Sequence, residues 1–349
     1  MIGAEHELQS PTRREAVRSG APASCRRVFR PKQHAGKMPT LPGLSRSMVA
    51  DERARAARAA LADCQLCAHH CGVNRLAGET GLCHAGAAAR FFLAQTEVTD
   101  EIELIPTFAV ALSGCDLRCD FCITGAESWN PRAGNAFSAE AMAVKARAAL
   151  ADGAKTVMLL GGEPTIHLPA ALEFVSHLPD DATLVWKTNA HGSAQARALL
   201  DGMFDVWLAD YKFGNDDCAQ RLAKIPHYVR VVQENLRWFA GKPSPERRAP
   251  SRFADGRRDT QLAETVLGAP GRGELIVRHL LMPGHVECCW RPVAEWLSEN
   301  LPGVKVNVRS GFWPAWHARK HVDFQNPLAA SEDEAAIAVA HNLGLNLIS

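Results

Sequence analysis

From Thr107 onward, short apolar runs typical of strands alternate with alanine-rich amphipathic segments, and this alternation constrains the fold more than any other feature. We expect helices at about 138–151, 168–177 and 193–201, and strands at 108–112, 156–160, 183–186, 206–209, 275–280 and 304–308. Strands separated by helices predict a parallel sheet with right-handed crossovers. Six such units are too few for a closed eight-stranded barrel. The predicted fold is therefore α/β, with a partial (β/α)6-type parallel barrel.

The remaining segments define the expected domain organisation. Residues 1–49 are rich in Lys and Arg, lack periodicity and have no signal-peptide core, which predicts a disordered or misassigned leader. Residues 50–100 predict a helix, at about 50–63, followed by a cysteine-rich metal-binding segment. Residues 101–349 form the expected core domain, and the Pro-, Arg- and Gly-rich stretch at 241–273 predicts a long loop insertion in it.

Composition excludes some partners and points to metal chemistry. A net charge of +1 and a pI near 7.6 give no reason to expect bulk binding to nucleic acid or to an anionic membrane. Because no apolar run approaches the ~20 residues of a membrane-spanning helix, we expect a soluble, cytoplasmic protein. The chain has 11 cysteines, more than packing requires, and two tight groups contain most of them.

The first group is Cys115, Cys119 and Cys122, in a loop directly after the first expected strand. Gly114 lets the backbone curl, so the three sulfurs can be directed at a common point. Loops at the carboxyl ends of strands are where α/β proteins place their active sites. Three thiolates leave a four-iron cluster with an open coordination position, which suits a catalytic site.

Two other interpretations of this group remain open from spacing alone. One is a disulfide plus a free thiol, although the chain lacks a secretion signal. The other is a zinc ion with a fourth ligand from elsewhere in the chain.

A second element, Gly161-Gly162-Glu163-Pro164, follows the second expected strand. Two glycines permit close approach of a ligand, and the proline stiffens the exit from the turn. A backbone carbonyl or Glu163 could then hold a ligand ammonium. A βα turn without any ligand is the alternative interpretation.

The pattern Cys-x3-Cys-x2-Cys, with an aromatic residue before the last cysteine, resembles the signature of the radical S-adenosylmethionine (SAM) superfamily. The resemblance implies that Cys115, Cys119 and Cys122 ligate a [4Fe-4S] cluster whose fourth iron is chelated by SAM. It also implies that Phe121 lies near the adenine and that the GGE-type motif at 161–164 binds the amino group of SAM.

Polar residues after the next two strands extend the resemblance. Thr188-Asn189 is similar to the Thr-Asn-Gly element of glycyl-radical-enzyme activases, and Asp210-Tyr211-Lys212 is similar to their Asp-Leu-Lys element. The resemblance implies that four of these residues also bind the cofactor: Thr188, Asn189, Asp210 and Lys212. Capping of strand ends is the structural alternative. Those activases have an aspartate before the threonine that helps to hold a monovalent cation. This chain has Lys187 there, and we hypothesise that its ammonium replaces the cation.

The second cysteine group, Cys64, Cys67, Cys71 and Cys83, supplies four thiols for a closed site, either structural zinc or a fully ligated second iron–sulfur cluster. Simple thiols without metal are the alternative. The segment resembles the N-terminal Cys-rich element of a radical SAM subgroup described as pyruvate formate-lyase activase-like. Residues 277–284 are similar to the R-H-L-x-x-P-G element of that subgroup, so the likeness covers about 64–345.

The last strand departs from the subgroup, because residues 310–317 are aromatic-rich where relatives tend to have Gln-Tyr-x-Pro. These aromatics are expected either to form part of a substrate wall or to pack in the core. Cys218, Cys288 and Cys289 have no partner at ligand spacing in the sequence, and we interpret them as packing residues.

The resemblance implies a radical SAM enzyme of the activating-enzyme, oxidoreductase type. It would cleave SAM reductively to a 5′-deoxyadenosyl radical that abstracts hydrogen, in one version from a glycyl radical enzyme. The alternatives are modification of a small molecule or peptide and, in a different class, a non-catalytic iron–sulfur or zinc protein. The expected partners are a flavodoxin or ferredoxin reductant and a glycyl radical enzyme or peptide substrate.

Overall fold

The structure is a computed structural model, and it describes residues 45–98, 101–241 and 273–348. All of these residues belong to one compact unit that runs from Pro39 to Ser349. Most of the predicted leader at 1–49 and nearly all of the predicted insertion at 241–273 lie outside the described residues. Within the described part of the chain, no helix has the length and apolar character needed to span a membrane.

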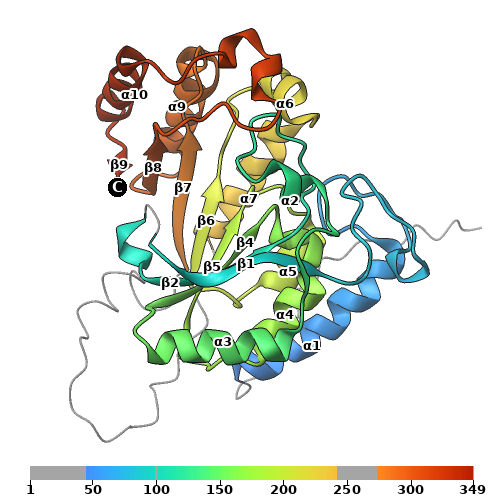
Figure 1. Ribbon diagram of the computed structural model, residues 1–349. Helices are drawn as coiled ribbons and strands as arrows, with labels where there is room; N and C mark the ends of the chain where they lie inside the picture. The colour runs from blue at the N-terminus through green and yellow to red at the C-terminus, as the bar shows by residue number, and fades with distance from the viewer. Residues whose placement is uncertain (1–44, 99–100, 242–272, 349) are drawn as a thin grey trace, which may run out of the picture. The chain divides into compact units, whose positions relative to one another are not determined.

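A nine-stranded sheet in the order β3-β1-β2-β4-β5-β6-β7-β8-β9 organises the fold (Figure 1). Every pair from β2 to β9 is parallel, whereas β1 pairs antiparallel with both β2 and β3. The sheet ends in two edges, so it is an open, partial barrel, as predicted. The strands are β1 Arg90–Glu97, β2 Thr107–Leu112, β3 Asn135–Ala136, β4 Thr156–Gly161, β5 Thr183–Thr188, β6 Val206–Asp210, β7 Glu274–Leu280, β8 Lys305–Arg309 and β9 Asn346–Leu347.

All six predicted strands are present, each within two residues of its expected ends. The longest strand, β1, was not predicted, because its half-buried and exposed residues follow no clear alternation. It pairs with the buried β2 and extends the sheet beyond the parallel units.

The three predicted helices correspond to α3, α4 and α5, and the helix expected at about 50–63 is α1 followed by a 3₁₀ turn. Helix α1 begins earlier than expected because the Ser45 side chain accepts a hydrogen bond from Met48 N, which caps the helix. The helices are α1 Arg46–Ala59, α2 Gly125–Trp129, α3 Ala139–Ala151, α4 Leu168–Ser176, α5 Ala194–Leu200, α6 Asp216–Ala223, α7 Tyr228–Gly241, α9 Arg291–Asn300 and α10 Ala330–Asn342.

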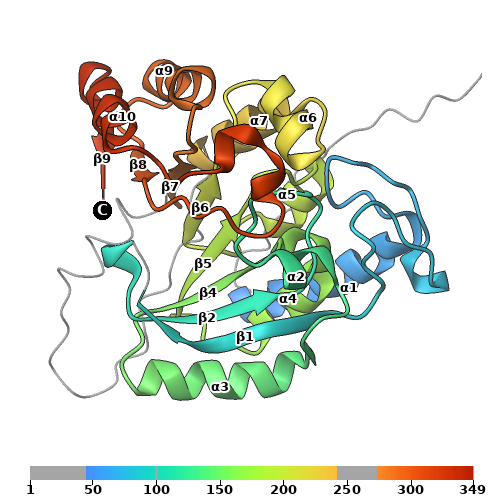
Figure 2. The same cartoon turned by 45° about the horizontal axis from the view of Figure 1, so that its top comes forward.

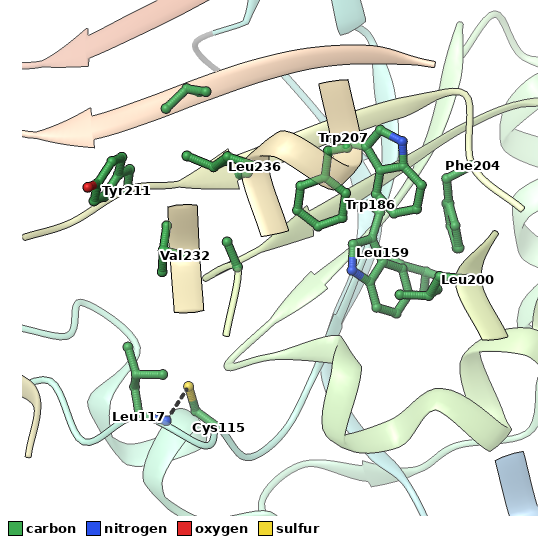
Figure 3. Close-up of a cluster of buried hydrophobic side chains, with 14 of the residues drawn as sticks. Cys115, Leu117, Leu159, Trp186, Leu200, Phe204, Trp207, Tyr211, Val232 and Leu236 are labelled. Carbon is green, nitrogen blue, oxygen red and sulfur yellow. Dashed lines mark hydrogen bonds between the residues drawn. The ribbon is translucent and has the colours of Figure 1, made fainter. Parts of the chain in front are cut away.

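Helices cover one face of the sheet, and α1 runs along α4 on that side (Figure 2). Alternate residues of the strands face these helices and form the main core. A large aromatic group lies there, with ring centroids of Trp186 and Phe204 4.7 Å apart and Trp207 next to them (Figure 3). Burial of such large rings is a principal source of stability in the domain.

The opposite, inner face of the parallel strands has an apolar floor. Its members include Met158, Val185, Leu208 and Ile276, and all of them are fully buried. Because side chains alternate along a strand, Lys187 and Asp210 lie on the same face as the floor, one step closer to the carboxyl ends of their strands. The inside of the partial barrel therefore changes from apolar to charged toward that end.

Candidate active site

The carboxyl ends of β2, β4, β5 and β6 place the predicted site residues at one edge of the sheet. The cysteine loop follows β2, the glycine turn follows β4, Thr188-Asn189 ends β5, and Asp210-Tyr211-Lys212 ends β6. Neighbouring parallel strands end side by side, so these loops come together as the sequence predicted.

Hydrogen bonds within the cysteine loop and to helix α6 fix its backbone. Cys115 and Cys119 are buried and Cys122 is half-buried. Leu117 N donates a hydrogen bond to Cys115 Sγ at 3.4 Å (Figure 3). Arg118 N and Asp120 N donate to the carbonyls of Ala223 and Leu222 at 3.0 and 2.8 Å. The C-terminal end of α6 therefore holds the backbone of this loop.

Burial makes these thiols poor anions unless a cation accompanies them. It raises the pKa of Cys115 well above the usual range. It also raises the pKa of Cys119 to about 12, although the Lys212 ammonium acts in the opposite direction. A bound metal centre supplies the missing positive charge, because thiolates are the ligand form of cysteine. The two buried cysteines are therefore neutral thiols when no metal is bound, and binding of a metal centre would deprotonate them.

The spacing of the sulfurs bears on the type of centre. Among the described residues, two groups bring three or more His, Cys, Asp or Glu ligand atoms within 4.8 Å of one another, and neither group contains any of the three loop cysteines. Tetrahedral zinc would require sulfurs about 3.8 Å apart. An iron–sulfur cluster distributes its thiolates over several irons, so a wider arrangement suits a cluster.

The two glycines of the turn after β4 have a structural reason. Gly161 has a φ of 140°, and a Cβ there would lie 2.1 Å from the carbonyl oxygen of Leu112. A Cβ on Gly162 would lie 2.0 Å from the carbonyl oxygen of Gly114. Glu163 N also donates to Gly114 O at 2.9 Å. The glycines therefore let the end of β4 pack directly against the start of the cysteine loop.

The Glu163 carboxylate is buried and fully engaged with the chain. One oxygen accepts hydrogen bonds from Thr165 N, Thr165 Oγ1 and Thr188 Oγ1, and the other accepts one from Asn189 N at 2.7 Å. Burial, together with the nearby Asp116 carboxylate, raises the pKa of Glu163 to about 7. Glu163 thereby joins the end of β4 to the end of β5. Pro164 is also buried, at the start of a 3₁₀ turn.

Asp116 is the centre of a network that the sequence analysis missed. Its carboxylate accepts from Asn189 Nδ2 and lies against His191 Nδ1, both at 2.7 Å. Asn189 Nδ2 also lies 3.7 Å from Cys115 Sγ. Burial opposes ionisation of Asp116, but the hydrogen bonds with His191 and Asn189 and the charge interaction with His191 together outweigh it and lower the pKa of the carboxyl. With His69, these residues form one of the two close groups of ligand atoms.

Charged side chains from three strands form the layer above the apolar floor. The Lys212 ammonium lies 2.6 Å from Asp210 Oδ2, and Arg278 Nε lies 3.9 Å from Asp210 Oδ1 and 3.0 Å from Glu101 Oε1. Burial works against ionisation of Asp210, but these cations prevail and lower its pKa to about 2. Burial, with the nearby Arg278, lowers the pKa of Lys187 to about 8.

The N-terminal cysteine segment packs beside this edge. Ala68 N donates to His191 O, and Ser193 N donates to Leu66 O, so the segment pairs with the chain just after β5. His69 Nε2 lies 2.9 Å from the Asp116 carbonyl oxygen. Cys64, Cys67 and Cys83 are buried and Cys71 is half-buried. Burial raises the pKa of both Cys67 and Cys83.

Aromatic residues from the last strand region meet the cysteine loop in two ways. The buried Phe121 ring lies about 6 Å, between centroids, from the rings of Phe213, Phe312 and Phe324. Phe312 is therefore part of the core, whereas 67% of Trp313 and 43% of Trp316 are exposed. The two expected roles of this segment, core packing and an accessible wall, fall to different residues.

Cys218 and Cys289 are buried in the main core and Cys288 packs against it, as expected for packing residues. Their arrangement in space adds a feature that the sequence spacing does not show. Together with His285 they form the second close group of ligand atoms among the described residues. The sequence hid this group because α6 and the turn before α9 are 70 positions apart and meet only in the fold.

The comparisons with known proteins agree with the site. The family model of the radical SAM superfamily matches residues 110–245, which contain the cysteine loop, the glycine turn and the polar ends of β5 and β6. The uncharacterized protein MJ0674 of Methanocaldococcus jannaschii is 28% identical over 296 residues, or 82% of this chain and 76% of the relative. Residues 110–245 are thus similar to the radical SAM superfamily, and this similarity implies a [4Fe-4S] cluster and SAM as cofactors.

Two solved structures are similar to part of the chain. Streptococcus suis SuiB bound to S-adenosylmethionine is 14% identical, with a TM-score of 0.45 over 67% of this chain and 47% of SuiB. A radical SAM methyltransferase from Sphaerobacter thermophilus is 15% identical, with a TM-score of 0.44 over 69% of this chain and 65% of the methyltransferase. The chain thus spans about half the length of SuiB.

Proposed function

Taking the chain as a radical SAM enzyme, we propose that Cys115, Cys119 and Cys122 hold its catalytic [4Fe-4S] cluster and that it abstracts hydrogen from a polypeptide partner. When bound and reduced, the cluster supplies the electron that cleaves SAM and generates a carbon radical. The observation that carries the proposal is the position of this loop at the carboxyl edge of the open barrel, with Cys115 and Cys119 buried and Cys122 half-buried beside the ends of β4 and β5.

The glycine turn and the end of β5 would position SAM. The Glu163 carboxylate already accepts four hydrogen bonds from the chain, so a backbone carbonyl of Gly161 or Gly162 is the better acceptor for the amino group of SAM. Glu163 would act as a positioning residue, because it fixes Asn189, whose amide nitrogen lies near Cys115 Sγ. Phe121 would bring its aromatic packing group close to the adenine.

The charged layer would face SAM and the substrate from the barrel interior. Asp210 and Lys212 form a close ion pair there, and the apolar floor beneath them excludes water. We assign the role of the monovalent cation to the Lys187 ammonium. This assignment predicts that turnover is independent of added potassium or sodium.

The proposed polypeptide partner rests on exposed apolar residues around the cysteine loop. Ile123 directly follows Cys122 and is 78% exposed. Trp316 packs against Gly125, and His321 of the same region bonds to Asp120. Trp313 and Val322 are also exposed, and we propose that these two residues, with Ile123 and Trp316, form an apolar rim of the kind that marks protein contacts. A glycyl radical enzyme is the partner that the subgroup resemblance favours, with a flavodoxin or ferredoxin as reductant.

The test is anaerobic reconstitution with iron and sulfide, reduction, addition of SAM and measurement of 5′-deoxyadenosine. We expect product from the wild-type protein and none above background from the Cys115→Ala/Cys119→Ala/Cys122→Ala variant. A wild-type protein with a fully loaded, reduced cluster that forms no 5′-deoxyadenosine would instead be a non-catalytic iron–sulfur protein. Incubation of the active protein with candidate glycyl radical enzymes and small peptides, with deuterium transfer into 5′-deoxyadenosine as readout, would then distinguish the substrates.

A further inference from the structure

We propose that Cys218, His285, Cys288 and Cys289 form a structural zinc site that is separate from both cysteine groups recognised in the sequence. Each residue offers one donor atom, and all four donor atoms lie within 4.8 Å of one another. Three sulfurs and one imidazole nitrogen make a Cys₃His set, which is a standard donor set of closed, four-coordinate structural zinc.

The distances between the donors match one tetrahedral ion. Cys288 Sγ lies 3.9 Å from Cys218 Sγ, 3.9 Å from Cys289 Sγ and 3.3 Å from His285 Nδ1. With ordinary zinc–sulfur and zinc–nitrogen bond lengths, a tetrahedron has edges of about 3.8 Å between sulfurs and about 3.6 Å between sulfur and nitrogen. A disulfide would require sulfurs about 2.05 Å apart. The arrangement therefore suits a shared metal ion better than a covalent bridge.

The local backbone explains how one short segment supplies three donors. Val286–Trp290 is a π-helical turn, and His285 is its N-terminal flanking residue. His285 precedes Cys288 and Cys289 by three and four positions, the separations that place helical side chains on one face. Single π-helical turns are rare and occur frequently at functional sites. Cys218, in α6, completes the set from the opposite side.

The surroundings provide the second layer of contacts that metal ligands usually have. Asn215 Nδ2 lies 3.4 Å from Cys218 Sγ and donates to Cys288 O at 2.6 Å, so one amide touches both elements. Asp323 Oδ2 lies 3.9 Å from His285 Nε2. Metal at Nδ1 leaves the imidazole proton on Nε2, and a hydrogen bond from it to Asp323 would need a small shift, because 3.9 Å is too long for one. Arg221, which now lies 3.2 Å from Nε2, already pairs with Asp323 and is exposed enough to turn aside.

The donors are also shielded, as a structural site requires. Cys218, His285 and Cys289 are 8%, 4% and 0% exposed, and Cys288 is half-buried. Binding of the ion deprotonates the three thiols and releases three protons, and no oxidation or reduction takes place. The buried position keeps the thiolates from solvent oxidants and leaves no open coordination position for a substrate.

The site has a consequence for the cysteine loop. Cys218 lies in α6, and the carbonyls of Leu222 and Ala223 at the end of that helix hold Arg118 N and Asp120 N of the loop. Zinc would fasten α6 to the segment before α9 and thereby fix the platform on which the loop rests. The zinc site would support the catalytic loop without sharing a residue with it.

The experiment measures zinc per chain in protein whose N-terminal segment cannot bind metal. The background variant carries Cys64→Ser, Cys67→Ser, Cys71→Ser and Cys83→Ser, and is purified anaerobically without reconstitution. We expect about one zinc per chain in this background and less than a tenth of that after the further changes Cys218→Ser and Cys288→Ser. Replacement of zinc by cobalt should give the intense thiolate-to-cobalt absorption of a tetrahedral site, and the same two changes should remove it.

Two further variants keep a structural effect distinguishable from metal binding. His285→Cys, which leaves four thiolate donors, should retain zinc, whereas His285→Ala should bind it more weakly. Circular dichroism checks the fold of each variant. The proposal is overturned if zinc stays near one per chain without Cys218 and Cys288. It is also overturned if the folded background protein neither contains nor takes up zinc or cobalt. In that case Cys218 and Cys288 would be found as a disulfide, or as thiols that are alkylated equally with and without a chelator.

Discussion

The cysteine loop and the Cys218–His285–Cys288–Cys289 group are both made of thiols, yet they differ in how the chain builds them. The loop collects its cysteines within eight consecutive residues at the end of one strand and spreads their sulfurs. The Cys218–His285–Cys288–Cys289 group collects its donors from two elements 70 positions apart and brings the donor atoms within 4.8 Å of one another. Close sequence spacing therefore marks the proposed catalytic cluster, whereas close spatial packing marks the proposed structural ion.

The largest expected effect separates the two regions by activity. Replacement of Cys115, Cys119 and Cys122 by Ala should remove essentially all SAM cleavage, a loss of at least about a thousandfold, because the protein then lacks the proposed ligands of the catalytic cofactor. The same variant should keep the zinc of the proposed Cys218–His285–Cys288–Cys289 site. Activity and zinc content are measured on the same sample. If a folded variant lost both activity and zinc, the two groups of thiols would not be independent, which would contradict the comparison.

The next effect concerns the packing beneath the loop. Gly162→Ala should lower SAM cleavage by about 10- to 100-fold, because a Cβ there would collide with the Gly114 carbonyl oxygen, 2.0 Å away, and displace the start of the loop. Gly86→Ala is the matched control, since a Cβ on Gly86 meets no atom within 4 Å. Equal activity in the two variants would show that this contact does not position the loop.

Loss of the Cys218–His285–Cys288–Cys289 group should lower the stability of the fold more than it lowers activity. Cys218→Ser/Cys288→Ser should lower the melting temperature by several degrees, a destabilisation of about 2–4 kcal/mol at the metal-bound site. SAM cleavage should fall only a few-fold, because the proposed cluster ligands Cys115, Cys119 and Cys122 remain. Differential scanning fluorimetry with and without a zinc chelator tests this, and the chelator should shift the wild-type protein but not the variant. A chelator shift of equal size in both proteins would contradict the zinc assignment.

The smallest effect concerns the charged layer and appears as a pH dependence. The pKa of Lys187 is lowered from 10.5 to about 8 in the folded protein. Between these pH values the unfolded chain binds more protons at Lys187 than the folded chain does, so the free energy of unfolding rises with pH over this range. Glu163, whose pKa is raised from 4.5 to about 7, should lower stability as pH rises from 4.5 to 7.

Lys187→Met removes the first of these dependences. In the cofactor-free protein it should be stabilising by about 2 kcal/mol near pH 7, with the gain lost by about pH 10.5. Urea unfolding at several pH values measures the change. A variant with the same pH slope as the wild-type protein between pH 8 and 10.5 would show that Lys187 titrates normally in the fold.

Local patterns in the sequence predicted the parallel sheet and the edge at which the loops meet. Buried strands such as β2 and β4 are continuous apolar runs, so their position is visible in the sequence. Strand β1 was missed because a strand with mixed exposure lacks that signal. The network around Asp116 was missed for a different reason, since His191 and His69 reach it only after β5 and the N-terminal segment pack together.

The glycine turn shows the limit from the other direction. The sequence indicated close approach at Gly161 and Gly162, and the fold contains such an approach, to the backbone of β2 and the cysteine loop. Sequence alone could not distinguish contact with a ligand from contact with a neighbouring strand, because both require the absence of a Cβ. Only the position of Gly114 O reveals the second partner.

The most direct test is electron paramagnetic resonance of the reduced protein in the variant that lacks Cys64, Cys67, Cys71 and Cys83, recorded with and without SAM. The three cysteines of the loop should then hold a single [4Fe-4S] cluster, and its signal should change when SAM occupies the open iron. A cluster signal that is identical with and without SAM would contradict the assignment of this loop as a radical SAM site.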